Sequence, residues 1–382
     1  MRKLALIFAA ALAIGLPAPA WAAPVPPTVS SPAAVLVEAS TGQVLYQKDA
    51  GAVRAPASMT KLMTLHLALQ AVRQHKVRLG DPVSVSQRAW KTSGSQIWLE
   101  PGEAIPFGQL LRAVAIGSAN DACVAIAEHL AGSEEAFVAQ MNHEAKRLGM
   151  THTHYVNSHG LDVEGHVTSP LDMARLARAA VEDPGLLTLT SQREDRTIRD
   201  GKGGHLWLVN TNRLLGQVPG LDGLKTGYTG KAGHCLTATA KREGLRLIAV
   251  VMGGTSSKAR FADVQSLLSY GYANYQAVLL ARGGQQVGRV KVLRGTSGTV
   301  AATVQHDVSA VQERLSKPSV QLRPMLRQNV AAPVRRGQVV GQAAILLGGQ
   351  KVGEVPLVAS ADIGRQTFTL LLRQLLQGVL RL

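Results

Sequence analysis

Residues 54–64 have the sequence Arg54-Ala-Pro-Ala-Ser-Met-Thr-Lys-Leu-Met-Thr, in which a serine and a lysine stand three positions apart. The apolar residues that follow recur at helical spacing and predict a helix over residues 58–75. Ser58 and Lys61 would then share one face of that helix. A partly desolvated lysine amine loses its proton easily and can take the proton of a serine hydroxyl. The pattern is common, however, and an N-cap serine beside a surface lysine explains it as well.

Two further short motifs carry hydroxyl, amide and ammonium groups. Ser118-Ala-Asn120 lies between two predicted helices, where a loop can aim a hydroxyl and an amide into a cleft. Lys225-Thr-Gly227 falls on a predicted strand edge, where it would offer a cation and a hydroxyl to a carboxylate. Each motif is weak alone. The three occur in this order, 60 and then 107 residues apart, and that combination is specific.

The order of the predicted elements indicates the fold class. A hairpin over residues 33–46 is followed by several helices, then by two alternating strands over 236–240 and 245–252, then by a helix over 261–275. This order predicts an α+β domain over residues 23–276, with a sheet built from both chain ends and a helical insertion. Short β-rich segments and the Gly348-Gly349 turn predict a small all-β domain over residues 277–362.

Both chain ends carry targeting signals. Residues 1–22 combine a basic start, a short apolar run and an Ala20-Trp-Ala22 cleavage site, which predicts a secretory signal peptide. Residues 363–382 predict a basic amphipathic helix that lies in a membrane interface without crossing it. Packing of that helix on its own domain or on a dimer partner is the alternative. Together the two ends predict a periplasmic protein attached peripherally to the outer face of the cytoplasmic membrane.

The charge and aromatic content limit the classes of binding partner, and the cysteine content limits the classes of fold and metal site. The net charge is +16, and residues 277–382 carry 14 basic and 4 acidic residues, or +10. An exported basic chain meets lipid headgroups and cell-wall polymers, and aromatics at 4% argue against a base-stacking nucleic-acid platform. Two cysteines exclude a disulfide scaffold and a cysteine-rich zinc module. Cys123 and Cys235 either pair after export or stay as free buried thiols, which their apolar surroundings favour.

Taken together, the three motifs resemble those of the low-molecular-mass penicillin-binding proteins, the serine D-alanyl-D-alanine carboxypeptidases that share ancestry with β-lactamases. The blocks at residues 35–46, 54–64, 118–125 and 157–162 also resemble the family. The resemblance covers residues 28–275 closely. It implies a β-lactamase/transpeptidase-like α+β domain with an antiparallel sheet, and the family's membrane-attached members also carry a β-rich second domain and a terminal amphipathic helix.

The resemblance implies acyl transfer in two steps. Ser58 would attack the carbonyl between two D-alanines with Lys61 as base, and Ser118 would relay a proton to the leaving amine. The backbone N–H groups of Ser58 and Tyr228 would form the oxyanion hole. Water would then release the acyl group, whereas a bound β-lactam would leave slowly. The residues implied to contact the peptidoglycan stem peptide are Asn120, Lys225, Thr226, Gly227, Tyr228 and Arg260. No cofactor, metal or nucleic acid is implied.

The sequence departs from the β-lactamase motifs at two positions, and it leaves several alternative functions open. Tyr228 follows Gly227 where β-lactamases often have Ser or Thr, and Ala119 stands where they typically have Asp. A class A β-lactamase needs a glutamate after the middle motif, and residues 150–167 offer only Glu164. A D,D-endopeptidase of the same superfamily is closer, and a non-catalytic wall-binding protein is a further possibility. A zinc enzyme could use the clustered histidines His152, His154, His159 and His166.

Overall fold

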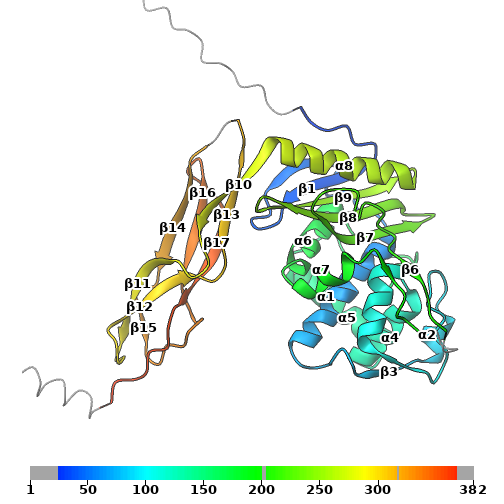
Figure 1. The fold of residues 1–382 in the computed structure, drawn as a ribbon, viewed down its shortest axis with the longest axis horizontal. Helices are drawn as coiled ribbons and strands as arrows, with labels where there is room; N and C mark the ends of the chain where they lie inside the picture. Colours follow the sequence, from blue (N-terminus) through cyan, green and yellow to red (C-terminus); the bar gives the residue numbers. More distant parts are fainter. Residues whose placement is uncertain (1–24, 200–203, 316–317, 368–382) are drawn as a thin grey trace, which may run out of the picture.

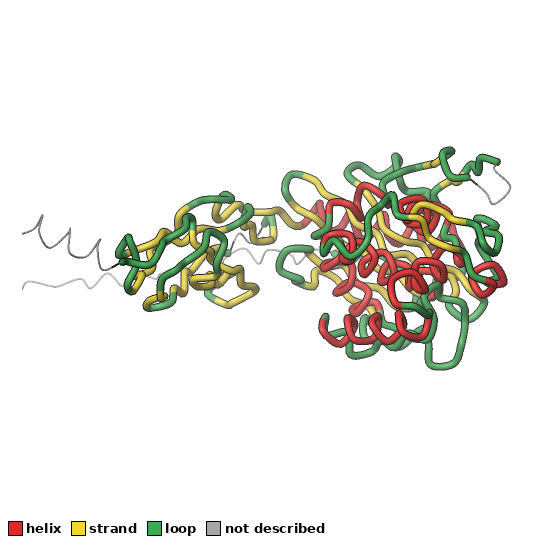
Figure 2. The backbone as a smooth tube through the Cα atoms, turned by 90° about the horizontal axis from the view of Figure 1, so that it is seen from below, coloured by secondary structure: helices red, strands yellow, loops and turns green. Residues whose placement is uncertain are grey.

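The fold is that of a computed structural model, which describes residues 25–199, 204–315 and 318–367. A unit rich in helices is followed along the chain by a unit made of strands and loops, and the two lie side by side (Figures 1 and 2). The predicted signal peptide at residues 1–22 lies outside the described residues. The amphipathic helix predicted over residues 363–382 does not begin at residue 363, because Ile363 and Arg365 form isolated β-bridges with Val334 and Gly295. The rest of that prediction, from residue 368 on, lies outside the described residues.

The first unit is built on a five-stranded antiparallel sheet with strand order β2-β1-β9-β8-β7. Strands β1 and β2 come from the start of the chain, and the other three come from residues 221–254. The prediction of an α+β sheet built from both chain ends is therefore confirmed. The strands are β1 (Ala33–Glu38), β2 (Val44–Lys48), β7 (Leu221–Thr229), β8 (Gly233–Arg242) and β9 (Leu245–Gly254).

Both faces of this sheet are covered by helices (Figure 1). Side chains alternate along a strand, so Val35 and Val37 of β1 join the core under the helical insertion, whereas Ala34 and Leu36 join the core under α8 (Ser257–Asn274). All six residues of β1 are buried as a result. Strand β7 forms one edge of the sheet and carries the third motif, Lys225–Gly227.

The helical insertion contains the predicted helices with two local departures. The predicted helix over 58–75 begins as a 3₁₀ turn, η1 (Ala57–Thr60), and continues as α1 (Lys61–Arg73). The helix α3 (Phe107–Arg112) runs into a π-helical turn, η2 (Ala113–Gly117), immediately before Ser118. The other helices are α2 (Gln87–Lys91), α4 (Asn120–Ala131), α5 (Glu134–Arg147), α6 (Pro170–Ala180) and α7 (Pro184–Thr190). Short two-stranded ladders join β3 (Pro82–Ser84) to β4 (Ala104–Pro106) and β5 (Glu194–Asp195) to β6 (Leu208–Val209).

The second unit is all β, as predicted. Its main sheet has the order β14-β16-β17-β12-β11-β15, and the Gly348-Gly349 turn joins β16 to β17 as the predicted hairpin. A separate ladder pairs β10 with β13, and a core of small and branched apolar residues fills the unit. The strands are β10 (Tyr275–Ala281), β11 (Gln286–Leu293), β12 (Thr299–Val304), β13 (Val308–Glu313), β14 (Val320–Leu326), β15 (Asn329–Ala331), β16 (Val339–Leu347) and β17 (Gln350–Ala359).

Candidate active site

Ser58 and Lys61 lie together at the start of the first helix. Ser58 is in the 3₁₀ turn η1 and is half-buried, whereas Lys61 begins α1 and is fully buried. The Lys61 Nζ donates to Ser58 Oγ at 2.9 Å, as the shared helix face predicts. The same amine donates to the carbonyl oxygen of His159 at 2.5 Å. Two acceptors therefore hold the lysine amine beside the serine hydroxyl.

The loop over residues 154–168 packs against α1 and helps to hold Ser58 and Lys61 in place. The Thr64 hydroxyl of α1 donates to the Ser158 carbonyl oxygen at 2.6 Å. The backbone N–H of Val156 donates to His166 Nδ1 at 2.9 Å, so the ring proton sits on Nε2, which lies 2.8 Å from Thr60 Oγ1. These contacts fix the loop, and with it the His159 carbonyl, against the helix that carries Ser58.

Burial makes the Lys61 amine a better candidate for accepting the serine proton, because it disfavours the charged form. Desolvation lowers its pKa from the usual 10.5 to about 8, and electrostatic interactions with the nearby Cys123 and Asp121 partly oppose that shift. Lys225 is also buried, and its pKa is held well below the usual value first by burial and then by the charge of Lys61. Because two buried ammonium groups repel each other, a charged Lys61 makes the charged form of Lys225 less favourable.

We therefore expect the acylation rate to depend on pH. If neutral Lys61 takes the Ser58 proton, protonation below its pKa of about 8 removes the base. The second-order rate of acylation by a β-lactam should fall about tenfold for each pH unit below that pKa and level off above it. The rate is measured with a β-lactam whose own charge is constant over the range. A rate that does not change between mildly acidic and mildly alkaline buffer would contradict the role of Lys61.

The third motif lies on the edge strand β7, next to η1. A Cβ placed on Gly227 would lie 2.9 Å from the carbonyl oxygen of Pro56, so only glycine lets β7 pass this close to the serine turn. Lys225 and Thr226 are both buried. The Arg260 Nη1 of α8 donates to the Gly227 carbonyl oxygen at 3.0 Å and to that of Cys235 at 3.3 Å. Arg260 thus fixes the backbone of β7 at the third motif, and its positively charged group lies against that backbone.

Thr211, which lies outside the three motifs, contacts both polar side chains of the third motif. Thr226 Oγ1 donates to Thr211 Oγ1 at 2.7 Å, and Lys225 Nζ lies 3.5 Å from the same oxygen. The flanking Asn210 and Asn212 side chains donate to backbone carbonyls, which hold the loop in place. No sequence motif marks Thr211, because its place depends on the loop that folds back beside β7.

We expect Thr211→Val to weaken catalysis without unfolding the protein. The substitution keeps the shape of the side chain but removes the acceptor for Thr226 Oγ1, so Thr226 and Lys225 lose their fixed orientation. Removing one such hydrogen bond from a charged or catalytic group is expected to lower kcat/KM about tenfold. Steady-state kinetics on a D-Ala-D-Ala peptide measure it, and Thr211→Ser should restore most of the loss. Equal kinetics for the valine variant and the wild type would refute the assignment.

The middle motif lies where η2 meets α4, and both elements pack against α1. Ser118 is buried and has a left-handed backbone with φ of 63°, which is uncommon for a residue with a side chain. Asn120 Nδ2 donates to the Ser93 carbonyl oxygen at 2.7 Å, which orients its amide. The next residue, Asp121, accepts hydrogen bonds from the backbone N–H groups of Ile97 and Leu99 and anchors the same loop.

Tyr228 and Thr229 follow the third motif at the rim. Tyr228 is 60% exposed and its ring stacks on His234 with centroids 4.4 Å apart, so its side chain points away from Ser58's buried surroundings. Its backbone remains part of β7 beside η1. Thr229 Oγ1 donates to Asp162 Oδ1 at 2.8 Å and accepts from the Ala232 backbone N–H, so it closes the hairpin against the 154–168 loop.

Two surface depressions include residues that neighbour or contact the motifs. One of about 600 Å³ is lined by residues of the Ser93 loop, by Arg88 and Lys91, and by His159. The other, of about 630 Å³, is lined by Trp207, Arg213 and the asparagines on either side of Thr211. The side chains of the three motifs line neither depression.

The cysteines and clustered histidines do not form an alternative centre. Cys123 and Cys235 are free and buried, as favoured, and burial raises the thiol pKa values to about 12 and about 11. Burial lowers the pKa of His159 to about 3 and that of His166 to about 4. Within the described part of the chain, no group of three or more His, Cys, Asp and Glu side chains is placed to hold a metal ion. Glu164 is exposed on its loop.

Sequence comparison finds relatives along almost the whole chain. The D-alanyl-D-alanine carboxypeptidase family matches residues 20–256, and the C-terminal domain of penicillin-binding protein 5 matches residues 275–365. D-alanyl-D-alanine carboxypeptidase DacF of Bacillus subtilis is 39% identical over 342 residues, which are 89% of this chain and 88% of that protein.

Solved structures of penicillin-binding proteins have folds similar to that of this chain. Penicillin-binding protein 5 of Haemophilus influenzae has a TM-score of 0.71 and 29% sequence identity, covering 89% of this chain and 99% of that one. Penicillin-binding protein D2 of Listeria monocytogenes, in an ampicillin-bound form, has a TM-score of 0.57 and 33% identity over 64% of this chain and 98% of that one.

Proposed function

The chain belongs to the D-alanyl-D-alanine carboxypeptidase family of penicillin-binding proteins and is a serine-type D-alanyl-D-alanine carboxypeptidase, and from this premise we propose that Ser58 is its acylated nucleophile. The single observation that carries the proposal is the hydrogen bond from the buried Lys61 amine to Ser58 Oγ. Burial lowers the pKa of Lys61 to about 8, so a fraction of the amine is neutral near neutral pH and can take the hydroxyl proton.

The reaction then proceeds in two steps. Ser58 Oγ attacks the carbonyl carbon between the two D-alanines, and its proton passes to Lys61. The backbone N–H groups of Ser58 and Tyr228 stabilise the oxyanion, a contribution of about 10²–10³ in rate for each donor. Ser118 relays the proton from Lys61 to the leaving amine of D-alanine, so Lys61 is neutral again. Water hydrolyses the acyl-Ser58 ester, with the same lysine as base, and frees the shortened stem peptide.

Substrate recognition uses the remaining motif residues. Asn120, held by the Ser93 carbonyl, binds the substrate amide. Thr226 and Lys225 bind the terminal carboxylate, and Arg260 adds positive charge from behind β7. β-Lactams acylate Ser58 by the same attack, in keeping with the ampicillin-bound form known for the Listeria relative.

We further propose that the protein acts in the periplasm, attached to the outer face of the cytoplasmic membrane. The supports are the signal-like residues 1–22 and the basic amphipathic pattern of residues 363–382. In the described part of the chain, no helix combines the length and apolarity needed to cross a bilayer. Deleting residues 368–382 should move the protein from the membrane to the soluble fraction, and unchanged partition would refute the attachment.

The nucleophile is tested by labelling residues 23–382 with a fluorescent penicillin, beside Ser58→Ala. We expect a covalent adduct located on Ser58 by mass spectrometry, absent from a folded Ser58→Ala protein. Release of D-alanine from a peptide ending in D-Ala-D-Ala should be lost in parallel. An adduct on another residue, or none on the folded wild type, would overturn the assignment. A rapidly released adduct would indicate β-lactamase activity.

A further inference from the structure

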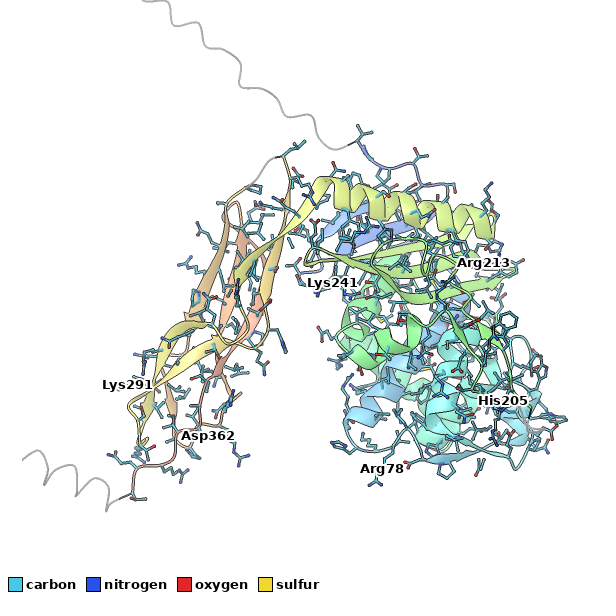
Figure 3. All side chains as sticks on the ribbon, in the orientation of Figure 1. Arg78, His205, Arg213, Lys241, Lys291 and Asp362 are labelled. Carbon is cyan, nitrogen blue, oxygen red and sulfur yellow. The ribbon has the colours of Figure 1, made fainter. Side chains whose placement is uncertain are left out.

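Five exposed cations gather at one end of the β domain, and we call this surface the basic end. It lies at the end away from the junction of α8 with β10, where Figure 3 labels Lys291 and Asp362 (Figures 1 and 3). Its cations are Lys291, Arg294, Arg335, Arg336 and Arg365.

Backbone contacts fix these cations relative to one another. The hairpin after β11 reaches the last described segment, where Gly295 pairs with Arg365 and the Thr296 N–H donates to the Gly364 carbonyl oxygen at 2.9 Å. Val334 pairs with Ile363 in the same way. Three chain segments that are distant in sequence therefore form one surface.

The basic end has almost no countercharge. Segments 291–299, 329–338 and 360–367 contain five basic residues and one acidic residue, Asp362, which gives a net charge of +4. Asp362 Oδ1 accepts the backbone N–H of Arg336 at 2.8 Å. In the residues that the structure describes, the side chains of Lys291, Arg294, Arg335 and Arg336 form no hydrogen bond or ion pair, and Arg365 donates to the Ala332 carbonyl oxygen.

Several arginines of the catalytic domain, by contrast, are paired with carboxylates. Arg112 pairs with Asp195 at 2.7 Å, and Arg246 pairs with Asp222 at 2.8 Å. Clustered like charges without partners repel one another, and water screens this repulsion. An anionic partner that binds the cluster offsets the repulsion and is attracted by all of its charges. The basic end thus has the charge pattern of a surface that binds an anionic partner.

The course of the chain indicates which anionic partner fits. The described chain ends at Thr367, within the basic end, so the remaining 15 residues start from this surface. Those residues contain two arginines, no acidic residue and many leucines. An apolar basic segment that starts from a fixed basic surface would bring that surface to the headgroups of the bilayer it enters.

We propose that the basic end is a docking surface for anionic phospholipid headgroups, which acts beside the C-terminal segment. The inference rests on the proposed attachment to the membrane and adds a second, electrostatic contact to it. Docking through this end would hold the β domain upright on the bilayer and keep the catalytic domain away from the lipid, on the side of the wall peptides.

The test compares vesicle binding by the full mature chain and two matched variants. One variant combines Arg294→Gln, Arg335→Gln and Arg336→Gln. The control combines Arg282→Gln, Arg323→Gln and Lys351→Gln, which remove the same charge from exposed positions of the same domain outside the basic end. Each protein is titrated with vesicles of phosphatidylcholine alone and of phosphatidylcholine mixed with phosphatidylglycerol, at low and high salt. Fluorescent penicillin labelling checks that each variant is folded.

We expect the basic-end variant to bind the mixed vesicles about 10- to 100-fold more weakly than wild type at low salt, with a much smaller difference at high salt. The control should lose far less. Equal binding by the basic-end variant and wild type, or an equal loss in the control, would overturn the inference. Tighter binding of wild type to a soluble anionic wall polymer than to the mixed vesicles would overturn the assignment to lipid.

Binding to the neutral vesicles reports on the C-terminal segment separately. All three proteins should bind them equally, because that contact is apolar. If none binds them, the proposed anchor fails, and the dependence on phosphatidylglycerol still decides whether the basic end docks on lipid.

Discussion

Replacing Lys61 with methionine is expected to slow the acylation of Ser58 by at least about 10³-fold in a folded protein. Methionine keeps most of the buried stem of the side chain and removes only the amine that donates to Ser58 Oγ at 2.9 Å. Without that amine in its neutral form, no described side chain is within hydrogen-bond distance of the serine hydroxyl to take its proton. The His159 carbonyl also loses its donor, which costs about 1–3 kcal/mol of stability.

Stopped-flow acylation by a fluorescent penicillin measures this prediction, with thermal unfolding as the check on the fold. Lys48→Met is the matched control, because Lys48 is a half-buried lysine that donates to the Val29 carbonyl at 2.8 Å, on the strand β2. It should label at the wild-type rate. A folded Lys61→Met protein that acylates within about tenfold of wild type would mean that another group removes the proton.

The motifs could be found in the sequence because each depends on residue types at short, fixed spacing. Ser58 and Lys61 are three residues apart, so a single helical turn decides their contact. The apolar run of β1 and the apolar spacing of α1 likewise predicted elements that the structure contains. The order of these elements along the chain then sufficed for the fold class.

The contacts that complete the site could not be predicted, because they join the motifs to distant or featureless positions. Lys61 is held by a backbone carbonyl of His159, and a carbonyl oxygen leaves no mark on the sequence. Thr211 is one threonine among many until its loop folds beside β7. The histidines of the 154–168 loop suggested metal ligands, whereas His166 hydrogen-bonds Thr60 and a backbone N–H.

Element boundaries were predicted less accurately than the elements themselves. The helix predicted over 261–275 begins earlier, at Ser257, and ends at Asn274, where the chain enters β10 at once with Tyr275. Apolar residues over 275–281 suit a helix as well as a strand, and only pairing with β13 decides between them. The π-helical turn before Ser118 was equally hidden, because its residues are all small or apolar and favour an ordinary helix.

Gly160→Ala is expected to destabilise the protein by about 3–5 kcal/mol and to slow acylation in the fraction that stays folded. Gly160 has φ of 95°, which alanine adopts only with strain. A Cβ at this position would overlap the Ala57 carbonyl oxygen and would lie 2.9 Å from Thr60 Oγ1. Because those atoms belong to the turn that holds Ser58, the loop can relieve the overlap only by moving away from η1.

Gly165→Ala separates this steric effect from backbone strain alone. Gly165 lies in the same loop with φ of 79°, but a Cβ there would meet only the His154 and Val156 side chains at 3.9 Å. It should cost about 1–2 kcal/mol and leave acylation unchanged. Urea unfolding and penicillin labelling of both variants measure the difference. If Gly160→Ala behaves like Gly165→Ala, the loop is not closely packed against the serine turn. The loop that carries the His159 carbonyl could then move without loss of its contact with Lys61.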